Sequence, residues 1–421
     1  MLLYILYIII SPIISLLLYV IALFNYKIRS NHCSFFIELF SIKKTLKLGH
    51  ANNKKILLFH AASAGEYEQL KPILRIIDKK KYFIIQSFTS PTIYNLESKT
   101  SDLFDIACYH PYDFLWRSWL FLKVINPERY IITRHDIWPG HITIASLLGI
   151  KTYYINANIH KNSIWFKKYF RTFTQRIFNQ LSIIFVPSNA IKKNLLLIGI
   201  SSSIIKVCDD TRFEQIMYRS IHNVPKIRLP KYFLDSDTII FGSIDNYDEQ
   251  VIFPAIAKLF PNGTKSLKNV SKSIIIVPHE NDNNTITRVA KELNNNNFNY
   301  ILSSDIKDSS SMHQSVILVN QIGILAELYK YSKIAYIGGG FKRGIHSVLE
   351  PAIYNCSLLC GPNIEMLDEA KILLNNQCLH IIANSKSLYQ FLSNKHIAHS
   401  NTSNLFIDNN SSKMILSEVL C

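Results

Sequence analysis

Short runs of apolar residues alternate with amphipathic stretches along most of this chain. The runs that predict buried strands in its first half are 55–60, 82–86, 130–133, 152–156 and 182–186. Stretches with helical periodicity at 68–78 and 140–148 separate some of these runs. Because the runs are continuous rather than alternating, they favour strands that are buried on both faces. Such strands, separated by helices, predict a parallel sheet that helices cover on both sides.

The same alternation starts again after an interruption. The segment 221–237 contains Pro225, Pro230 and alternating charge, and it predicts a linker between two domains at 27–220 and 238–421. The predicted strands of the second domain are 238–242, 273–277, 315–319, 334–337 and 357–360. Two consecutive α/β units of the doubly wound, Rossmann-like type predict a cleft between the carboxyl ends of their sheets.

The first residues, 1–26, contain no charged side chain and are dominated by Leu, Ile and Tyr. This length is enough to cross a hydrocarbon layer that needs about 20 residues, so the segment predicts a single membrane anchor. Basic residues begin at Lys27, which places the rest of the chain on the cytoplasmic side. A cleaved signal peptide fits less well, because a charged start and a small-residue cleavage site are missing. Pro12 leaves open a kinked segment that enters one leaflet only.

The net charge of the chain indicates which class of partner it binds. The formal net charge of +16 and the pI of about 9.3 favour anionic partners, first of all anionic lipid head groups and phosphorylated lipids. Nucleic acid fits less well, since the basic residues are scattered and form no nucleic-acid-binding motif. The seven cysteines include no CxxC pair, which favours structural thiols in a reducing compartment. No cluster with ligand spacing predicts a metal site.

A glycine-rich segment in the second half is the strongest candidate for binding chemistry. A strand-like run ends at Ile337, three glycines follow at 338–340, and a helix-like segment carries His346 and Glu350. Glycines let the backbone approach a phosphate, and a following helix N-terminus favours negative charge. The alternative is an ordinary loop between a strand and a helix.

Two carboxylates follow strands in the first half. Glu66 begins a helix just after the strand that ends at His60, where it could accept a proton. Asp136 follows the strand 130–133 in the same way. The alternative for Glu66, which the residues alone favour, is a first-turn carboxylate that complements the helix dipole, and for Asp136 it is a helix N-cap. Both are expected at the carboxyl edge of one sheet.

Several motifs together resemble a known family. The segments that carry the resemblance are Ser63-Ala64-Gly65-Glu66, Ser87 to Thr92, Tyr109-His110-Pro111-Tyr112-Asp113, Asp136-Ile137-Trp138-Pro139-Gly140, Asp210 to Glu214, Gly242-Ser243, Val277 to Glu280, and the glycine-rich segment from Ile337 to Pro351. In this order they are similar to the motifs of the 3-deoxy-D-manno-octulosonic acid (Kdo) transferases, membrane-anchored GT-B glycosyltransferases of lipopolysaccharide assembly. The similarity runs from the anchor to about residue 374.

The resemblance implies an inverting transfer of Kdo from CMP-Kdo to a hydroxyl of lipid IVA, the tetraacyl disaccharide bisphosphate precursor of lipid A, at the inner membrane. It places the general base on Glu66 and a second functional acid on Asp136. The donor-binding positions that it implies are Ser243, His279, Gly339, Gly340, Gly344, His346, Ser347 and Glu350. Arg212, Lys342 and Arg343 are basic residues suited to the anionic substrates. No cofactor or metal is expected, and no nucleic acid partner.

This chain departs from the family pattern at several of these positions. It has Asp136 where the pattern has Glu, Ser347 and Gly140 where it has Asn, Asp209 where it has Gly, and Ile244 where it has Thr. Two other functions therefore stay open. One is a GT-B transferase that uses a UDP-sugar on another membrane lipid, and the other is a non-catalytic relative that acts as a membrane-associated binding protein.

Overall fold

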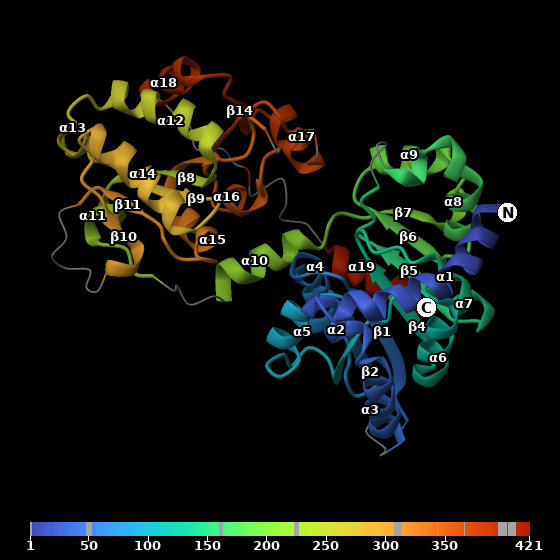
Figure 1. The fold of residues 1–421 in the computed structure, drawn as a ribbon. Helices are drawn as coiled ribbons and strands as arrows, with labels where there is room; N and C mark the ends of the chain where they lie inside the picture. Colours follow the sequence, from blue (N-terminus) through green and yellow to red (C-terminus); the bar gives the residue numbers. More distant parts are fainter. Residues whose placement is uncertain are drawn as a thin grey trace. The chain divides into compact units, whose positions relative to one another are not determined.

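The chain folds as two compact units. The computed structural model describes residues 2–47, 53–159, 163–222, 227–306, 314–342, 344–365, 367–394, 402 and 410–421. Unit 1 comprises Met1–Gln215 together with Asn409–Cys421, and unit 2 comprises Ile216–Asp408. Figure 1 shows a parallel sheet with helices packed around it in each unit. The prediction of two α/β domains with parallel sheets is confirmed.

The sheet of unit 1 has seven parallel strands in the order β3-β2-β1-β4-β5-β6-β7. These strands are β1 Lys55–Ala61, β2 Tyr82–Phe88, β3 Ile106–Tyr109, β4 Arg129–Thr133, β5 Lys151–Ile155, β6 Ile183–Val186 and β7 Ile205–Val207. The five predicted strands are all present, and the two unpredicted ones, β3 and β7, are short and lie at the two edges. The strand order reverses between β1 and β4, which is where ligands of doubly wound sheets bind.

Helices cover both faces of this sheet, and each face has its own apolar core. The helices of unit 1 before the boundary are α1 Leu2–Ala22, α2 Tyr26–His32, α3 Phe35–Lys47, α4 Ala64–Arg75, α5 Pro91–Glu97, α6 Leu115–Ile125, α7 Pro139–Leu147, α8 Arg171–Phe178 and α9 Asn189–Leu197, with the 3-10 turns η1 Ile164–Phe166, η2 Lys168–Phe170 and η3 Ser202–Ile204. Fully buried Tyr67 and Leu70 of α4 pack in one core, and Phe121 and Leu122 of α6 pack in the other.

The predicted anchor, 1–26, forms α1 and the start of α2. Along one side α1 packs on unit 1: Ala22 is buried, the Tyr7 hydroxyl donates to the Asp113 carbonyl oxygen at 2.6 Å, and the Tyr19 hydroxyl accepts from Arg117 at 2.7 Å. Within the part of the chain that the structure describes, no helix has the length and apolar character needed to cross a membrane. The predicted spanning anchor is therefore not confirmed.

The C-terminal helix α19, Ser411–Leu420, belongs to unit 1 although it follows unit 2 in the chain. Ile415 and Val419 are buried in the same core as Tyr67 and Leu70 of α4. Glu214 accepts from the backbone N–H of Ser412 at 2.7 Å. The predicted second domain, 238–421, thus differs from the observed unit at its end, because the apolar face of α19 is buried on the first sheet.

Unit 2 also has seven parallel strands, in the order β10-β11-β9-β8-β12-β13-β14. Its strand order differs from that of unit 1 on one side of the sheet, where β11 lies between β10 and β9. These strands are β8 Asp237–Ile244, β9 Lys272–Pro278, β10 Ile301–Leu302, β11 Val316–Leu318, β12 Ser332–Ile337, β13 Ser357–Cys360 and β14 Leu379–Ile381. The five predicted strands are again present. The unpredicted β10 and β14 are edge strands of two and three residues.

Helix α10, Arg212–His222, begins before the predicted linker, and the boundary between the two units falls within it, after Gln215. The remaining helices are α11 Lys231–Asp235, α12 Asn246–Leu259, α13 Thr264–Asn269, α14 Asn283–Asn295, α15 Leu325–Leu328, α16 Leu349–Ile353, α17 Asp368–Asn375 and α18 Ser385–Ser393, with the 3-10 turns η4 Ser303–Asp305 and η5 Tyr329–Tyr331. The predicted linker, 221–237, therefore contains the end of α10 and all of α11. Its Pro225 lies outside the described residues.

Candidate active site

The two predicted carboxylates lie at the point where the strand order of unit 1 reverses. Glu66 is in the first turn of α4, which follows β1, and Asp136 is in the loop after β4. Since β1 and β4 are paired and parallel, their carboxyl ends meet at one edge of the sheet. The structure thus brings Glu66 and Asp136 to the same corner, as the sequence predicts.

Glu66 has a local structural role at this corner. Its Oε2 accepts from the backbone N–H groups of Ala62 and Ser63, at 2.7 and 3.3 Å, and the Ser63 hydroxyl accepts from the Glu66 N–H at 3.4 Å. This is a capping box, so the alternative role as a helix-end carboxylate is real. Among the described residues both contacts use Oε2, and Oε1 is left for a ligand. Burial, followed by the charge of Asp136, raises the pKa of Glu66.

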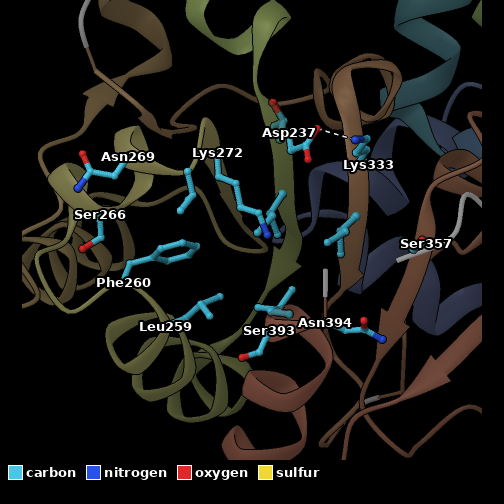
Figure 2. A pocket seen from close by; sticks show the side chains of 15 residues that line it. Asp237, Leu259, Phe260, Ser266, Asn269, Lys272, Lys333, Ser357, Ser393 and Asn394 are labelled. Atoms are coloured by element: carbon cyan, nitrogen blue, oxygen red, sulfur yellow. Dashed lines mark ion pairs between the residues drawn. The ribbon is translucent and has the colours of Figure 1, made fainter. Parts of the chain in front are cut away.

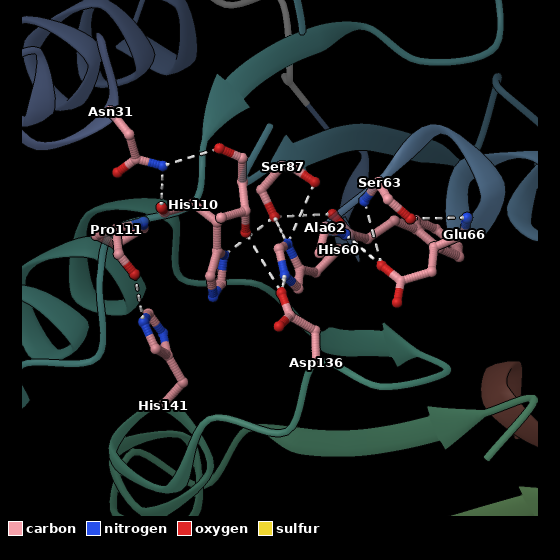
Figure 3. Close-up of polar contacts among 12 residues, drawn as sticks. Asn31, His60, Ala62, Ser63, Glu66, Ser87, His110, Pro111, Asp136 and His141 are labelled. Atoms are coloured by element: carbon pink, nitrogen blue, oxygen red, sulfur yellow. Dashed lines mark hydrogen bonds and ion pairs between the residues drawn. The ribbon is translucent and has the colours of Figure 1, made fainter. Parts of the chain in front are cut away.

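Asp136 is held by a histidine. Its Oδ2 lies 2.6 Å from Nε2 of the fully buried His60 and 3.3 Å from the Thr89 hydroxyl (Figure 3). Burial by itself raises the pKa of Asp136, but the hydrogen bond and charge of His60, with smaller contributions from Trp138 and Thr89, hold it below its usual value. Asp136 is therefore a carboxylate that stays ionised beside Glu66.

Three buried histidines stack behind this pair, and we call them the histidine cluster: His60, His110 and His141. The rings of His60 and His110 are 3.8 Å apart between centroids, and those of His110 and His141 are 4.2 Å apart. The Ser87 hydroxyl bridges His60 and His110, at 3.0 and 3.1 Å. Within the described parts of the chain, no group of His, Cys, Asp or Glu is arranged to hold a metal ion. The cluster was not predicted, although His60 lies near the end of β1, His110 directly follows β3, and His141 is in the first turn of α7.

The structure explains why position 140, where this chain departs from the family pattern, holds a glycine. Asp113 accepts from the backbone N–H groups of Gly140 and His141, each at 2.9 Å, and so caps the start of α7 from another segment. A Cβ on Gly140 would lie 2.6 Å from Oδ1 of Asp113. The space that a side chain at position 140 would need is occupied by the carboxylate of Asp113.

Arg212 lies at the start of α10 in unit 1. Its backbone N–H donates to Asp210 at 2.8 Å, and its guanidinium is 3.8 Å from the same carboxylate. Gln69 of α4 donates to both oxygens of Asp210 at 2.8 Å, and Arg134 approaches it at 3.8 Å. Asp210 therefore ties Arg212 and Arg134 to the helix that carries Glu66. A role of Arg212 in substrate binding stays a prediction.

In unit 2 the strand order reverses between β8 and β12, and the predicted donor residues lie near the carboxyl end of β8 or after β9 and β12. Ser243 adopts a positive φ of 55° at an irregularity in β8. Its hydroxyl lies 2.9 Å from Nδ1 of His279, whose ring stacks on His346 at 4.4 Å. The structure thus brings Ser243, His279 and His346 together at one edge of the second sheet.

The glycine-rich turn differs from the prediction. The N–H of Gly339 donates to Asp248 at 2.8 Å, and the N–H of Gly344 donates to the Gly339 carbonyl at 3.0 Å, so neither amide is free for a phosphate. A Cβ on Gly340 would lie 2.6 Å from the backbone of Gly361. Packing within the protein therefore requires glycine at positions 339 and 340, whether or not a ligand binds there.

The helix expected directly after the glycines was also placed wrongly. Helix α16 begins at Leu349, so His346 and Ser347 lie in the preceding irregular segment and only Glu350 is in its first turn. Backbone hydrogen bonds to Gly338 and Asn363 hold that segment in a compact loop instead of a longer helix. Ser347 and Glu350 are partly buried, and their proposed contacts with the donor stay predictions. Arg343 lies outside the described residues.

Asp248 was missed by the sequence analysis. It is fully buried in the first turn of α12, where it accepts from the N–H groups of Asp245 and Gly339 and from the Tyr336 hydroxyl. Burial raises its pKa. The signal that could have revealed it is the Asp-x-x-Asp spacing, from Asp245 to Asp248, at the start of a helix.

Two cavities of unit 2 lie at different edges of its sheet. One of about 310 Å³ is lined by residues that follow β8 and β9 and by the glycine-rich segment, namely Ile244, Asp245, Asn246, Tyr247, His279, Glu280, Thr285, Arg288 and Lys342. The other, about 580 Å³, is at the amino ends of β8, β9 and β12, where Asp237, Lys272 and Lys333 line it (Figure 2). The smaller one is the candidate donor site, because ligands of such sheets bind at the carboxyl ends of the strands.

Comparisons with known proteins agree with this geometry. A family model described as "3-Deoxy-D-manno-octulosonic-acid transferase (kdotransferase)" matches residues 40–215. A 3-deoxy-D-manno-octulosonic acid transferase of Rickettsia prowazekii is 27% identical over 370 residues, which cover 84% of this chain and 74% of the relative.

Solved structures show the same fold. A UDP-GlcNAc 2-epimerase from Methanocaldococcus jannaschii superposes with a TM-score of 0.59 at 16% identity, covering 87% of this chain and 99% of the other. A glycosyltransferase from Rickettsia africae superposes with a TM-score of 0.54 at 14% identity, covering 87% and 97%. At these identities the likeness shows the fold alone, which is two consecutive α/β units with parallel sheets.

Proposed function

Because the chain is a member of the Kdo transferase family, we propose that it transfers Kdo from CMP-Kdo to a hydroxyl of lipid IVA, with inversion at the anomeric carbon. The observation that carries this proposal is the pair of carboxylates, Glu66 and Asp136, at the reversal point of the first sheet. One of them is held ionised by His60, and the other keeps an oxygen for a ligand.

In the proposed reaction Glu66 is the general base. Its Oε1 accepts the proton of the acceptor hydroxyl while the hydroxyl oxygen forms the bond to the anomeric carbon of Kdo. The bond from that carbon to the phosphate oxygen breaks at the same time, and CMP leaves with the electron pair. A base must be ionised to act, and the raised pKa of Glu66 therefore sets an acidic limit on the rate above the range of an exposed glutamate.

The donor is proposed to bind at the smaller cavity of unit 2. His279 and Lys342 line it, and the Ser243 hydroxyl contacts His279. Lys342 Nζ contacts the Tyr247 hydroxyl at 2.6 Å on the exposed side, where a phosphate can approach it. Because the amides of Gly339 and Gly344 are used internally, charged and hydroxyl side chains are expected to hold the phosphate.

The protein is further proposed to work at the cytoplasmic face of the inner membrane. The side of α1 away from unit 1 carries exposed apolar side chains, and α3 adds others. These residues are Ile9, Ile13, Leu16, Leu17, Val20, Phe36, Ile37 and Phe40. An apolar face of this kind, with a net charge of +16, suits a helix that lies in an anionic membrane surface.

Vesicle flotation tests this membrane proposal. Vesicles of phosphatidylcholine with phosphatidylglycerol should carry the protein, and Leu16→Asp with Leu17→Asp should weaken the association. Leu147→Asp is a matched control, because Leu147 is 76% exposed at the end of α7, outside the apolar side of α1. Equal flotation of all three proteins would contradict the proposed role of α1.

Transfer from CMP-Kdo, generated in situ, to lipid IVA by the purified protein tests the reaction. We expect a product whose mass counts the Kdo residues added, and loss of that product in Glu66→Ala. Inhibition by CMP but not by UDP separates this function from a UDP-sugar transferase. An inactive wild-type protein, with folding and donor supply verified, would count against the transfer and favour the non-catalytic alternative.

A further inference from the structure

The proposed reaction leaves the buried histidine cluster without a function. His60 is the member that contacts the site, through the 2.6 Å bond from Nε2 to Oδ2 of Asp136. Its other nitrogen, Nδ1, lies 3.0 Å from the Ser87 hydroxyl and 3.3 Å from the Ser87 carbonyl oxygen. Both ring nitrogens therefore face oxygen atoms, which is an arrangement that a doubly protonated imidazolium satisfies.

The Ser87 hydroxyl allows His60 to hold this second proton. Besides the two histidines, its Oγ lies 3.1 Å from the carbonyl oxygen of Phe59. When the hydroxyl donates to Phe59, Nδ1 of His60 can donate to Ser87. When the hydroxyl turns to His60 instead, Nδ1 accepts and the ring is neutral. Both states keep every polar atom of this group bonded, so adding the proton requires only the rotation of one hydroxyl.

The positive charge is expected on His60 rather than on its stacked neighbours. Burial, followed by the charges of His60 and His141, holds the pKa of His110 well below its usual value. Burial also lowers the pKa of His141. His110 is satisfied as a neutral ring, because its Nδ1 contacts the Ser87 hydroxyl and its Nε2 lies 3.2 Å from the Tyr130 hydroxyl.

Among the residues that the structure describes, few other charges reach this corner. The titratable and charged groups around Glu66, Asp136 and His60, from every element packed there, are Asp113, Tyr130, Arg134, Tyr154, His110 and His141. Burial raises the pKa of both tyrosines, so they stay neutral. Asp113 is bonded to the start of α7, and Arg134 approaches Asp210. Among the contacts of the described residues, the positive group that reaches Asp136 is His60.

We propose that His60 carries a positive charge which offsets Asp136, and that it thereby keeps Glu66 ionised as the proton acceptor. Without that charge, two carboxylates would share one buried corner, and such pairs resist ionising together. His60 is thus a positioning residue that acts through Asp136. The inference rests on the proposed transfer, since it explains how the base of that reaction stays ready.

The dependence of kcat/KM on pH tests this for the wild type, His60→Gln and Asp136→Asn. Loss of the positive charge should move the acidic limb of the profile to higher pH, by about one unit or more, and loss of the negative charge should move it to lower pH. The double variant should return toward the wild-type limb, because neither charge is present. His141→Gln is the matched control. It removes a buried ring of the same stack but no contact with Asp136, so the acidic limb of the pH profile should not move.

Shifts in the same direction for both single variants, or a uniform loss of rate at every pH in His60→Gln, would overturn the charge role. So would an equal shift in His141→Gln. NMR of the full chain with labelled histidine rings gives a second test that needs no turnover. The signal that disappears in His60→Gln should be that of an imidazolium at neutral pH in the wild type, and Asp136→Asn should weaken that imidazolium signal.

A neutral His60 ring in that measurement would overturn the inference even if transfer occurs. An imidazolium signal that depends on Asp136, in a protein that transfers no Kdo at any pH, would instead uphold the charge pair and reject the proposed reaction. The two failures are therefore distinguishable.

Discussion

The two sheets reverse their strand order in the same way, yet the polar edges at these points are built differently. In unit 1 the edge consists of buried and half-buried side chains, with Glu66, Asp136 and the histidine cluster in fixed hydrogen bonds. In unit 2 it consists largely of backbone, where Gly338, Gly339 and Gly340 pack against neighbouring chain segments. The difference teaches that the reversal point of a parallel sheet can carry either a network of hydrogen-bonded side chains or a closely packed glycine loop, depending on which residues follow the strands.

The largest expected effect comes from removing the base in unit 1. Glu66→Gln keeps the size of the side chain but removes its ability to accept a proton, so kcat should fall by about 10²–10⁴-fold. Initial rates of Kdo transfer at saturating substrates measure this. Glu68→Gln on the same helix is the control, since Glu68 contacts Lys71 and Gln215 outside the corner. A change in kcat smaller than tenfold would reject Glu66 as the base.

The next effect tests the backbone edge of unit 2. Gly340→Ala places a Cβ 2.6 Å from the backbone of Gly361, and the free energy of unfolding should fall by about 1–3 kcal/mol. Urea unfolding monitored by far-UV circular dichroism measures the change. A variant as stable as the wild type would show that the backbone around Gly340 shifts at little cost to accommodate the added Cβ.

A glycine of unit 1 sharpens the contrast. A Cβ on Gly65 would meet nothing within 4 Å, and Gly65 lies in the first turn of α4. Gly65→Ala should therefore leave the free energy of unfolding unchanged or slightly higher. Because Gly65 adjoins Glu66, the added methyl group should raise KM for the lipid acceptor, by roughly tenfold. An unchanged KM would mean that the acceptor does not use this open space.

A smaller effect is expected from Lys342, the exposed cation of the proposed donor cavity. Lys342→Ala removes a flexible charge that contacts Tyr247, and KM for CMP-Kdo should rise by roughly two- to fivefold. Higher salt should reduce the difference between this variant and the wild type, because salt screens exposed charges. A salt-independent difference would point to a packing role instead.

The smallest expected effect concerns the larger cavity at the opposite edge of the second sheet. Lys272 lines that cavity at the amino end of β9, where burial lowers its pKa. Lys272→Ala should change kcat and KM by less than about twofold, since ligands of such sheets bind at the carboxyl ends of the strands. It is also the matched control for Lys342→Ala. A large rise in KM for the donor would move the donor site to the amino edge.

Much of the fold could be predicted from the sequence because the central strands are continuous apolar runs. The unpredicted β3, β7, β10 and β14 have two to four residues each and lie toward the sheet edges, where short strands leave a weak pattern. The helix predicted after the glycines failed for another reason. Contacts with distant residues, such as Asn363, hold residues 344–348 in a loop, and local periodicity does not report such contacts.

The candidate site also has parts that the sequence predicts and parts that it does not. Glu66 and Asp136 could be predicted to meet, because each follows a strand and parallel strands end at one edge. The stacking of His60 on His110 depends on which strands are neighbours. The order β3-β2-β1-β4 cannot be predicted from the sequence of any single segment. The contact that excludes a side chain at Gly140 also joins residues far apart in the chain.

The return of α19 to the first sheet has a consequence for biosynthesis. A ribosome releases the whole of unit 2 before residues 411–420, so the core that Ile415 and Val419 complete stays open until then. Apolar surface on α4 is exposed during that interval, and such surface invites aggregation or chaperone binding. The unit that begins first is thus the last to be finished, and its folding waits on the synthesis of its partner.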